Sequence, residues 1–262
     1  MTVALCHIDL LTIHYRGQMN AAVKGLSLDL MSGERLAIVG ESGSGKSTFV
    51  RALSGLLPAG TVYDGRMQWS EGRSPRLGRD LGFVFQDASS SLNPVLRVGE
   101  QVAESARRHL GMTWPQAYGH ARELLEHVRI PNAHAVMRAY PHQMSGGQRQ
   151  RVAIAAAIAG RPSILIADEA TSALDTVVQA EIVTLLDELV RKNAMTLIFV
   201  THDIALASNL ADRIAVFKDA HLIEIGPVAD VLSNPKSGYT KSLIAGHLDL
   251  KSPSLIGGAS ST

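Results

Sequence analysis

Cysteine is nearly absent from this 262-residue sequence, which contains a single one, Cys6. One cysteine excludes a disulfide framework within the chain, and it also excludes a cysteine-ligated metal or iron–sulfur site. Aromatic residues are scarce as well, at 5%, whereas apolar residues make up 46%. We therefore expect an aliphatic core of the kind found in α/β proteins. The length is sufficient for one large domain, or for a core with a small subdomain.

The chain also has little net charge and no long hydrophobic run. Its formal charge of +1 gives no electrostatic reason to expect a nucleic acid or an anionic membrane as a partner. The most apolar stretch, Val152–Ala159, stops at Gly160, far short of the roughly 20 residues that a membrane-spanning helix requires. The N-terminal segment shows neither the basic nor the apolar region of a signal peptide. We expect no nucleic-acid partner, and contact with any membrane from outside the bilayer.

Hydrophobic periodicity predicts strands in both halves of the sequence. Period-2 alternation predicts two strands of a β layer, at Val3–Tyr15 and Gly25–Leu30. Continuous apolar runs at Ser163–Ala167 and Thr196–Val200 predict strands buried on both faces of a parallel sheet. Two further apolar strands are predicted at Arg35–Val39 and Leu81–Phe85. Two further short strands are expected around a turn at Asp219-Ala220, at Ile214–Lys218 and Leu222–Ile225.

Helical patterns account for much of the remaining sequence. Helices are predicted from Lys46 to about Leu56 and over Val177–Lys192. Helix formers dominate residues 89–160, which interrupt the alternation of strands and helices. The Ser/Gly-rich tail, residues 252–262, is predicted to be disordered. The sum is a parallel α/β core with a helical insertion.

A phosphate-binding loop lies between a predicted strand and the helix that follows it. The pattern G-x-x-x-x-G-K-[ST] is met by Gly40, Glu41, Ser42, Gly43, Ser44, Gly45, Lys46 and Ser47, with Thr48 next in the helix. The glycines let backbone N–H groups surround phosphate oxygens, and the helix start directs its positive end at them. We expect Lys46 to reach the β- and γ-phosphates and Ser47 to ligate Mg²⁺. A glycine-rich turn that happens to match is disfavoured by this strand–helix context.

Two acidic residues follow the predicted strand at residues 163–167. We expect Asp168 to hold Mg²⁺ through water, and Glu169 to be the general base that polarises an attacking water. Taken alone, such a pair could equally be a solvated turn, but the phosphate loop upstream favours the functional interpretation.

Polar residues follow two other predicted strands in the same way. His202 comes after the strand at 196–200, and open α/β sheets bind ligands at the carboxyl ends of their strands. This position favours contact with a γ-phosphate, although a lone histidine there is more often structural. Gln86 follows the strand at 81–85 and is expected to touch Mg²⁺ or the attacking water.

A further motif, Ser145-Gly146-Gly147-Gln148, resembles the signature of ATP-binding cassette (ABC) ATPases. The order of this motif, the phosphate loop and Asp168–Glu169 is similar to that superfamily over residues 3–235 or so. The resemblance implies ATP and Mg²⁺ as ligands. It also implies the fold of an α/β P-loop NTPase, with a parallel-sheet core, an N-terminal antiparallel β layer and an inserted α-helical subdomain.

The same resemblance implies roles for single residues. Gln86 resembles the glutamine-loop residue of the family, and His202 resembles its switch histidine. Asp175 lies in Ser172-Ala173-Leu174-Asp175, which resembles the aspartate loop. Tyr15 looks like the aromatic residue that stacks on adenine, with a strand aromatic packed in the core as the alternative.

In ABC dimers the phosphate loop of one subunit faces the signature of the other, with ATP between them. Here Gly146 and Gly147 open a predicted helix that runs to Ala159, so N–H groups at its start can receive a γ-phosphate from a partner's ATP. Ser145 would add a hydroxyl donor. Ser145 is also a good helix N-cap, and both roles can hold at once.

Other segments resemble the dipeptide/oligopeptide/nickel importers within the superfamily, and these are Phe85-Gln86-Asp87, Ser91-Leu92-Asn93-Pro94, Tyr140-Pro141-His142-Gln143 and Tyr239-Thr240-Lys241-Ser242-Leu243. Leu57-Pro58-Ala59-Gly60 and a short tail are most similar to nickel or opine-metallophore members. The resemblance implies a second ATPase subunit (a related chain or a second copy), two permease subunits and, indirectly, an extracytoplasmic substrate-binding protein. It places the chain at the cytoplasmic face of a bacterial inner membrane. The cysteine cluster that many peptide-importing members carry is missing.

The expected division is a nucleotide-binding core at residues 1–88 and 161–234, a helical signature subdomain at 89–160, and a short C-terminal extension at 235–262. The favoured function is the ATP-hydrolysing subunit of an importer for peptides, nickel or metal–opine chelates. The alternative is a soluble ABC ATPase that serves a non-transport complex, such as carbon–phosphorus lyase.

Overall fold

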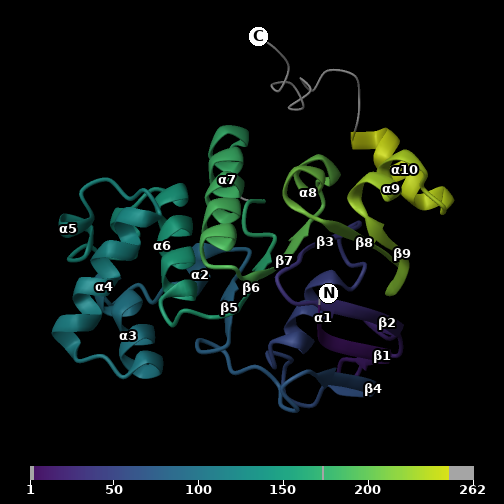
Figure 1. The fold of residues 1–262 in the computed structure, drawn as a ribbon, viewed down its shortest axis with the longest axis horizontal. Helices are drawn as coiled ribbons and strands as arrows, with labels where there is room; N and C mark the ends of the chain where they lie inside the picture. The colour runs from purple at the N-terminus through teal and green to yellow at the C-terminus, as the bar shows by residue number, and fades with distance from the viewer. Residues whose placement is uncertain (1–2, 173, 248–262) are drawn as a thin grey trace, which may run out of the picture.

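The computed structural model describes residues 3–172 and 174–247. Two sheets lie side by side, with helices on both faces of the larger one and a group of helices at one end of the molecule (Figure 1). The tail predicted to be disordered, residues 252–262, lies outside the described residues.

The smaller sheet is antiparallel, with the strand order β2-β1-β4. Its strands are β1 (Ala4–His14), β2 (Val23–Met31) and β4 (Val62–Trp69). The first two confirm the predicted β layer. The third was not predicted, because the side chains of β4 are mostly exposed and leave no apolar alternation in the sequence.

The larger sheet has six strands in the order β5-β6-β7-β3-β8-β9. Their bounds are β3 (Arg35–Val39), β5 (Leu81–Val84), β6 (Ile164–Asp168), β7 (Thr196–Thr201), β8 (Arg213–Lys218) and β9 (His221–Pro227). The first five run parallel to one another, as predicted for β6 and β7. The sheet is nevertheless mixed, since β9 runs antiparallel to β8. The cause is the short turn at Asp219 and Ala220, both with positive φ, because such a turn joins only antiparallel neighbours.

The helices of the described residues include the three that the sequence placed individually, which begin near Lys46, Gly146 and Val177. Their bounds are α1 (Lys46–Leu53), α2 (Ala88–Ser91), α3 (Val98–Leu110), α4 (Trp114–His127), α5 (Ala133–Val136), α6 (Gly146–Ile158), α7 (Thr176–Lys192), α8 (Ile204–Leu210), α9 (Val228–Ser233) and α10 (Gly238–His247). The helix α1 ends three residues before the predicted Leu56. The Ser54 hydroxyl donates a hydrogen bond to the Val50 carbonyl, and Gly55 leaves the helix with a φ of +69°.

The two faces of β3 belong to different hydrophobic clusters. Leu36 and Ile38 pack with α1 against the antiparallel sheet, so that α1 lies between the two sheets. Ala37 and Val39 pack against α8 and α10 on the opposite face. The phosphate loop that leaves β3 is therefore supported from both faces of the larger sheet.

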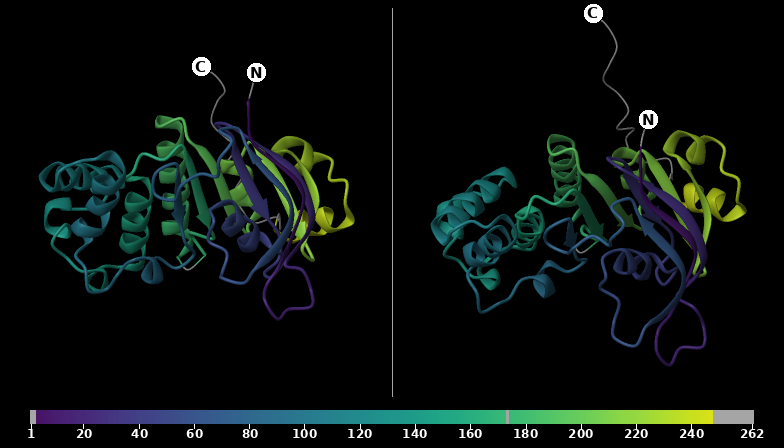
Figure 2. Two further views of the ribbon diagram at one scale, coloured as in Figure 1. Left: turned by 90° about the horizontal axis from the view of Figure 1, so that it is seen from below. Right: turned by 60° about the horizontal axis from the view of Figure 1, so that its bottom comes forward.

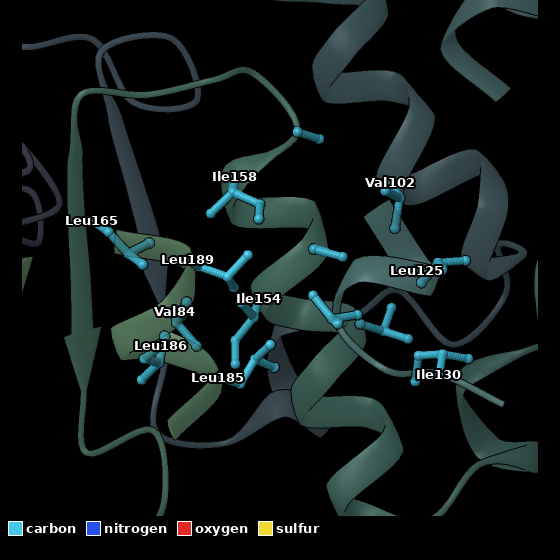
Figure 3. Close-up of a cluster of buried hydrophobic side chains, with 14 of the residues drawn as sticks. Val84, Val102, Leu125, Ile130, Ile154, Ile158, Leu165, Leu185, Leu186 and Leu189 are labelled. Atoms are coloured by element: carbon cyan, nitrogen blue, oxygen red, sulfur yellow. The ribbon is translucent and has the colours of Figure 1, made fainter. Parts of the chain in front are cut away.

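A third cluster joins the end group of helices to the sheet. In Figure 3 the side chains of α6 lie between those of α3 and α4 on one side and those of β5, β6 and α7 on the other. Ile154 and Ile158 of α6 are buried in this cluster. The views in Figure 2 show the same helices, α3 to α6, beyond the β5 edge of the sheet. Within residues 3–172 and 174–247 no helix is both long and apolar enough to cross a membrane.

Candidate active site

The phosphate loop leaves the carboxyl end of β3 and enters α1, and close backbone contacts fix both of its ends. Gly40 has a φ of +149°, and a Cβ at this position would lie 2.1 Å from the Phe217 carbonyl oxygen in β8. Gly45 has a φ of +101°, and a Cβ there would lie 2.3 Å from the Ala22 carbonyl oxygen. Both glycines are therefore required by space as well as by conformation. The loop is held between the end of β8 and the start of β2.

Lys46 turns back onto its own loop. Its Nζ donates hydrogen bonds to the carbonyl oxygens of Gly40, at 2.8 Å, and of Glu41, at 2.7 Å. The side chain is buried, and it lies 4.0 Å from Glu169 Oε1. Burial lowers the pKa of Lys46, while the charges of Glu169, Asp168 and Glu41 oppose that shift. The ammonium is thus held by carbonyls and acids at the place where the sequence predicts phosphate.

The start of α1 presents polar groups without protein partners. Gly45 is the N-cap, and it provides no side-chain cap for the N–H groups of the first turn. Ser44 Oγ is buried and makes no hydrogen bond within the part of the chain that the structure describes. Buried polar groups are normally hydrogen-bonded. An oxyanion at this helix start would supply acceptors for these donors.

Ser47 and Asp168 meet at the same edge of the sheet. Ser47 Oγ donates a hydrogen bond to Asp168 Oδ1, at 2.8 Å. The register of the parallel strands pairs Asp168 with Val200, and β3 lies next to β7, so the loop after β3 and the end of β6 share one edge. Burial raises the pKa of Asp168, whereas the hydrogen bond from Ser47 lowers it.

Glu169 and Gln86 form a second linked pair. Gln86 Nε2 donates to Glu169 Oε2, at 3.0 Å, and to Ser172 Oγ, at 3.4 Å. Glu169 has a φ of +47°, and its backbone N–H donates to the Val200 carbonyl, at 3.0 Å. The segments after β5 and β6 are therefore connected by side chains.

Two other predicted residues lie near this edge with different environments. The Tyr15 hydroxyl and Thr48 Oγ1 are 3.0 Å apart, which brings the end of β1 onto α1 next to Ser47. Tyr15 is half-buried rather than enclosed in the core. His202 is exposed, directly after β7 and before Asp203, whose carboxylate caps α8.

The signature segment lies elsewhere, at the start of α6 among the end group of helices (Figure 1). Ser145 Oγ accepts a hydrogen bond from the Gln148 N–H, and Gln148 Oε1 accepts one from the Ser145 N–H, at 3.0 Å. This reciprocal pair confirms the predicted N-cap. It leaves the N–H groups of Gly146 and Gly147 without intrahelical acceptors, since the first turn of a helix has none.

The segment that resembles the aspartate loop lies next to the signature. A Cβ at Gly147 would lie 2.9 Å from Val178 in α7, and a Cβ at Gly146 would lie 3.6 Å from Leu174. Asp175 is the N-cap of α7, with its carboxylate accepting from the Val178 N–H at 3.0 Å. A side chain at Gly147 would therefore crowd Val178 of α7, whereas a Cβ at Gly146 would make an ordinary van der Waals contact.

One contact with the phosphate loop was not foreseen from the sequence. The backbone N–H of Glu41 donates to the hydroxyl of Tyr239 in α10, at 3.2 Å. The two residues are 198 positions apart. The sequence marked Tyr239 only as part of a subfamily-like tail, and no local pattern could pair it with the loop.

The parallel sheet and its phosphate loop define a nucleotide-binding protein of the P-loop class. Residues 23–172, more than half of the chain, match the family described as ABC transporter. The chain therefore belongs to the ABC transporter family, as its motifs predicted.

Curated relatives are import ATP-binding proteins. The chain is 42% identical over 251 residues to the glutathione import ATP-binding protein GsiA of Salmonella paratyphi A, and 43% identical over 244 residues to that of Escherichia coli K12. The alignments cover 90% and 87% of this chain but 40% and 39% of the relatives. The chain thus spans about two fifths of the length of the curated relatives it matches.

Solved structures of ABC cassettes confirm the predicted fold class. The dimeric post-hydrolysis state of the cassette MJ0796, bound to ADP and Pi, matches with a TM-score of 0.73 at 29% identity, over 85% of this chain and 98% of that one. CbiO1 from Clostridium perfringens, part of the transporter complex cbiONQ, matches with a TM-score of 0.74 at 27% identity, over 88% and 91%.

Proposed function

We propose that this chain is the ATP-binding and ATP-hydrolysing subunit of a bacterial ABC importer. The observation that carries the proposal is the pair of linked contacts beside the phosphate loop, Ser47 with Asp168 and Gln86 with Glu169. These contacts gather phosphate-binding, metal-binding and water-activating groups at one sheet edge. The curated relatives named for glutathione import support the importer class.

ATP binding uses Lys46 together with the donors of the phosphate loop that lack a protein partner. Lys46 leaves the carbonyls of Gly40 and Glu41 for the β- and γ-phosphates, and Ser44 and the first N–H groups of α1 donate to phosphate oxygens. Tyr15, next to Thr48, provides the ring that stacks on adenine.

The oxygen donors beside the loop fit a magnesium ion. Ser47 Oγ and Asp168 Oδ1 are hard oxygen ligands 2.8 Å apart, and Mg²⁺ usually takes one or two protein ligands together with phosphate oxygens and water. Within the described residues no cluster of three or more His, Cys, Asp or Glu could hold a metal by itself. Phosphate and water oxygens would complete the coordination of a bound ion, with Gln86 near it. When bound, the ion neutralises phosphate charge.

Hydrolysis requires a base for the attacking water, and Glu169 is the residue we assign. Its Oε2 accepts from Gln86, and its Oε1 lies 4.0 Å from Lys46. When Lys46 moves to the phosphates, the carboxylate is free to accept the proton of a water held by Gln86. His202, exposed at the same sheet edge, contacts the γ-phosphate.

The second half of each ATP site comes from a partner subunit. The N–H groups of Gly146 and Gly147, with Ser145 and Gln148, face a partner's γ-phosphate, and Asp175 lies beside them at the same interface. The dimeric structures of the similar cassette MJ0796 support a dimer. The ATPase partner is a second copy or a related chain.

The conformational change that accompanies ATP binding and hydrolysis passes to two permease subunits through the helical region, residues 89–160. A cavity of about 190 Å³ lies between the segment around β5 and α2 and the signature helix α6, and Phe83, Phe85, Leu92 and Ala153 are among its lining residues. This groove adjoins both Gln86 and α6, so a permease segment bound there would respond to a conformational change at Gln86 or at α6.

In this proposal residues 1–88 and 161–234 act as the nucleotide-binding core, residues 89–160 as the signature subdomain and residues 235–262 as a C-terminal extension.

The relatives' names favour a small peptide as cargo, delivered by an extracytoplasmic binding protein, with nickel and metal–opine chelates as the other classes. The chain would act at the cytoplasmic face of the inner membrane.

Affinity purification of the tagged chain from native membranes tests the proposal that it serves an importer. Co-elution of permease subunits is the expected result. Recovery only in a complex free of membrane proteins would overturn it in favour of an accessory ATPase.

A further inference from the structure

One peptide group of the phosphate loop is held at both ends. The Gly40 carbonyl accepts a hydrogen bond from Lys46 Nζ, at 2.8 Å, and the Glu41 N–H donates one to Tyr239 Oη, at 3.2 Å. These two groups belong to the same peptide unit. Because a trans peptide is planar, its C=O and N–H point in opposite directions. Lys46 and Tyr239 therefore form hydrogen bonds to opposite sides of one planar peptide group.

Tyr239 is fixed from outside the loop. Lys218 Nζ lies 4.7 Å from the centre of the Tyr239 ring, a cation–π contact. The ring also packs on the cluster that contains Val39 and Val216, at the ends of β3 and β8. Lys218 follows Phe217, whose carbonyl borders Gly40. The tyrosine thus sits on the same strand ends that position the loop.

The start of α10 is fastened to β9. The Glu224 carboxylate accepts hydrogen bonds from the backbone N–H groups of Lys236, at 2.9 Å, and Ser237, at 3.2 Å. Ser237 Oγ caps the first turn by accepting from the Thr240 N–H, at 2.9 Å, and Thr240 is fully buried. These contacts lie outside the phosphate loop, and they hold the start of α10, and with it Tyr239, against β9.

We propose that Tyr239 is a positioning residue for ATP binding, whose hydroxyl keeps the Gly40–Glu41 peptide in its binding orientation. The proposal rests on the proposed ATPase function. When Lys46 leaves the Gly40 carbonyl for phosphate, that peptide loses one of its two supports. The bond to Tyr239 then prevents it from rotating, so the loop reaches phosphate already ordered. Docking of α10 and nucleotide affinity are thereby coupled.

Tyr239→Phe in the full chain is the direct test, because it removes the hydroxyl and retains the ring over which Lys218 lies. Loss of one hydrogen bond predicts a Kd for MgATP about two- to tenfold higher. KM should rise in parallel, with kcat little changed and Tm within about 2 °C of the wild type. Tyr63→Phe is the matched control, since Tyr63 is exposed on β4, and it should change none of these values.

Hydrogen exchange gives a readout that does not depend on nucleotide. The amide of Glu41 should exchange several-fold faster in Tyr239→Phe than in the wild type without ATP, while amides of β3 keep their protection. An unchanged Kd and unchanged Glu41 exchange would overturn the positioning role, as would a fall in kcat at constant KM. Failure of the wild-type chain to bind MgATP would instead overturn the proposed function, so the two failures are distinguishable.

Discussion

Glu169 joins a chemical role to a strained backbone. A non-glycine residue at a φ of +47° costs roughly 1–2 kcal/mol relative to an ordinary conformation. The hydrogen bond from its N–H to the Val200 carbonyl helps to maintain that conformation. Strain of this kind gathers at functional sites, where the surrounding structure keeps it in place. The conformation turns the carboxylate toward Gln86 and Lys46 rather than into the strand.

Glu169→Gln should separate ATP binding from hydrolysis. The amide keeps the size of the side chain and its contact with Gln86, but it cannot accept a proton from water. We expect ATP to bind with wild-type affinity and to be hydrolysed at least tenfold more slowly, with an ATP-bound dimer accumulating on size-exclusion chromatography. Glu104→Gln, on the exposed face of α3, is the control. Near-normal turnover in Glu169→Gln would remove Glu169 from its proposed role.

Cys6 should be inert in the folded protein. Burial, with the nearby charge of Asp29, raises the pKa of its thiol to about 12, and its side chain is 1% exposed. The reactive thiolate is therefore scarce at pH 8. Ellman's reagent should leave the native protein unlabelled at pH 8 and label one thiol per chain after unfolding in guanidinium. The pKa difference also predicts that the free energy of unfolding falls as the pH rises from about 9 toward 12, because the unfolded chain loses this proton first.

At the scale of single elements, the start of α6 carries two roles that a substitution can separate. Ser145 caps the helix, and its hydroxyl would also face a partner's γ-phosphate. Asp is as good an N-cap as Ser, and its charge is favourable at a helix start. Ser145→Asp should therefore keep the stability of the monomer and its affinity for ATP.

The same substitution should stop hydrolysis, because it sets a negative charge against the phosphate that the partner presents. We expect at least a tenfold loss of ATPase activity at an unchanged Tm. Ser145→Ala is the matched variant, since it lacks the cap and the charge alike. It should lose about 1 kcal/mol of stability and retain more activity than Ser145→Asp. The reverse order of activities would show that capping is the only role of Ser145.

The sequence was most informative where an element is buried on both faces. The strands β3, β6 and β7 appear as uninterrupted apolar runs because neighbouring strands and helices cover them completely. The exposed strand β4 and the short helix α8 have no comparable pattern and were not predicted. Local burial, rather than distance along the chain, decided which elements could be recognised.

At the scale of the whole molecule, a head-to-tail dimer of identical chains predicts complementation. In Lys46→Ala both phosphate loops are defective, and in Ser145→Asp both signatures are defective. A mixed dimer has one site built from an intact loop and an intact signature. Mixing the two inactive variants should restore ATPase activity that neither shows alone. Mixed dimers that form but remain inactive would contradict a site shared between two copies.

The candidate site was predictable as far as its residues lie within short motifs. Lys46, Ser47, Asp168 and Glu169 each follow a recognisable strand, and the parallel register brings their strands to one edge. The contact of Tyr239 with Glu41 depends on how α10 docks against β3 and β8. Such a contact leaves no recognisable pattern in the sequence. The residues around Tyr239 give no indication of Glu41, and those around Glu41 give no indication of Tyr239.

The order in which the chain is synthesised determines when the phosphate loop gains its supports. The loop's strand, β3, lies between β7 and β8, and its tyrosine partner is 198 positions further along the chain. A ribosome makes the loop early and these supports late, and chains begin to fold from the N-terminal side during synthesis. A nascent chain that has reached only α7 carries the complete loop sequence without its neighbouring strands. The phosphate loop therefore gains its full set of supports only once translation has passed α10.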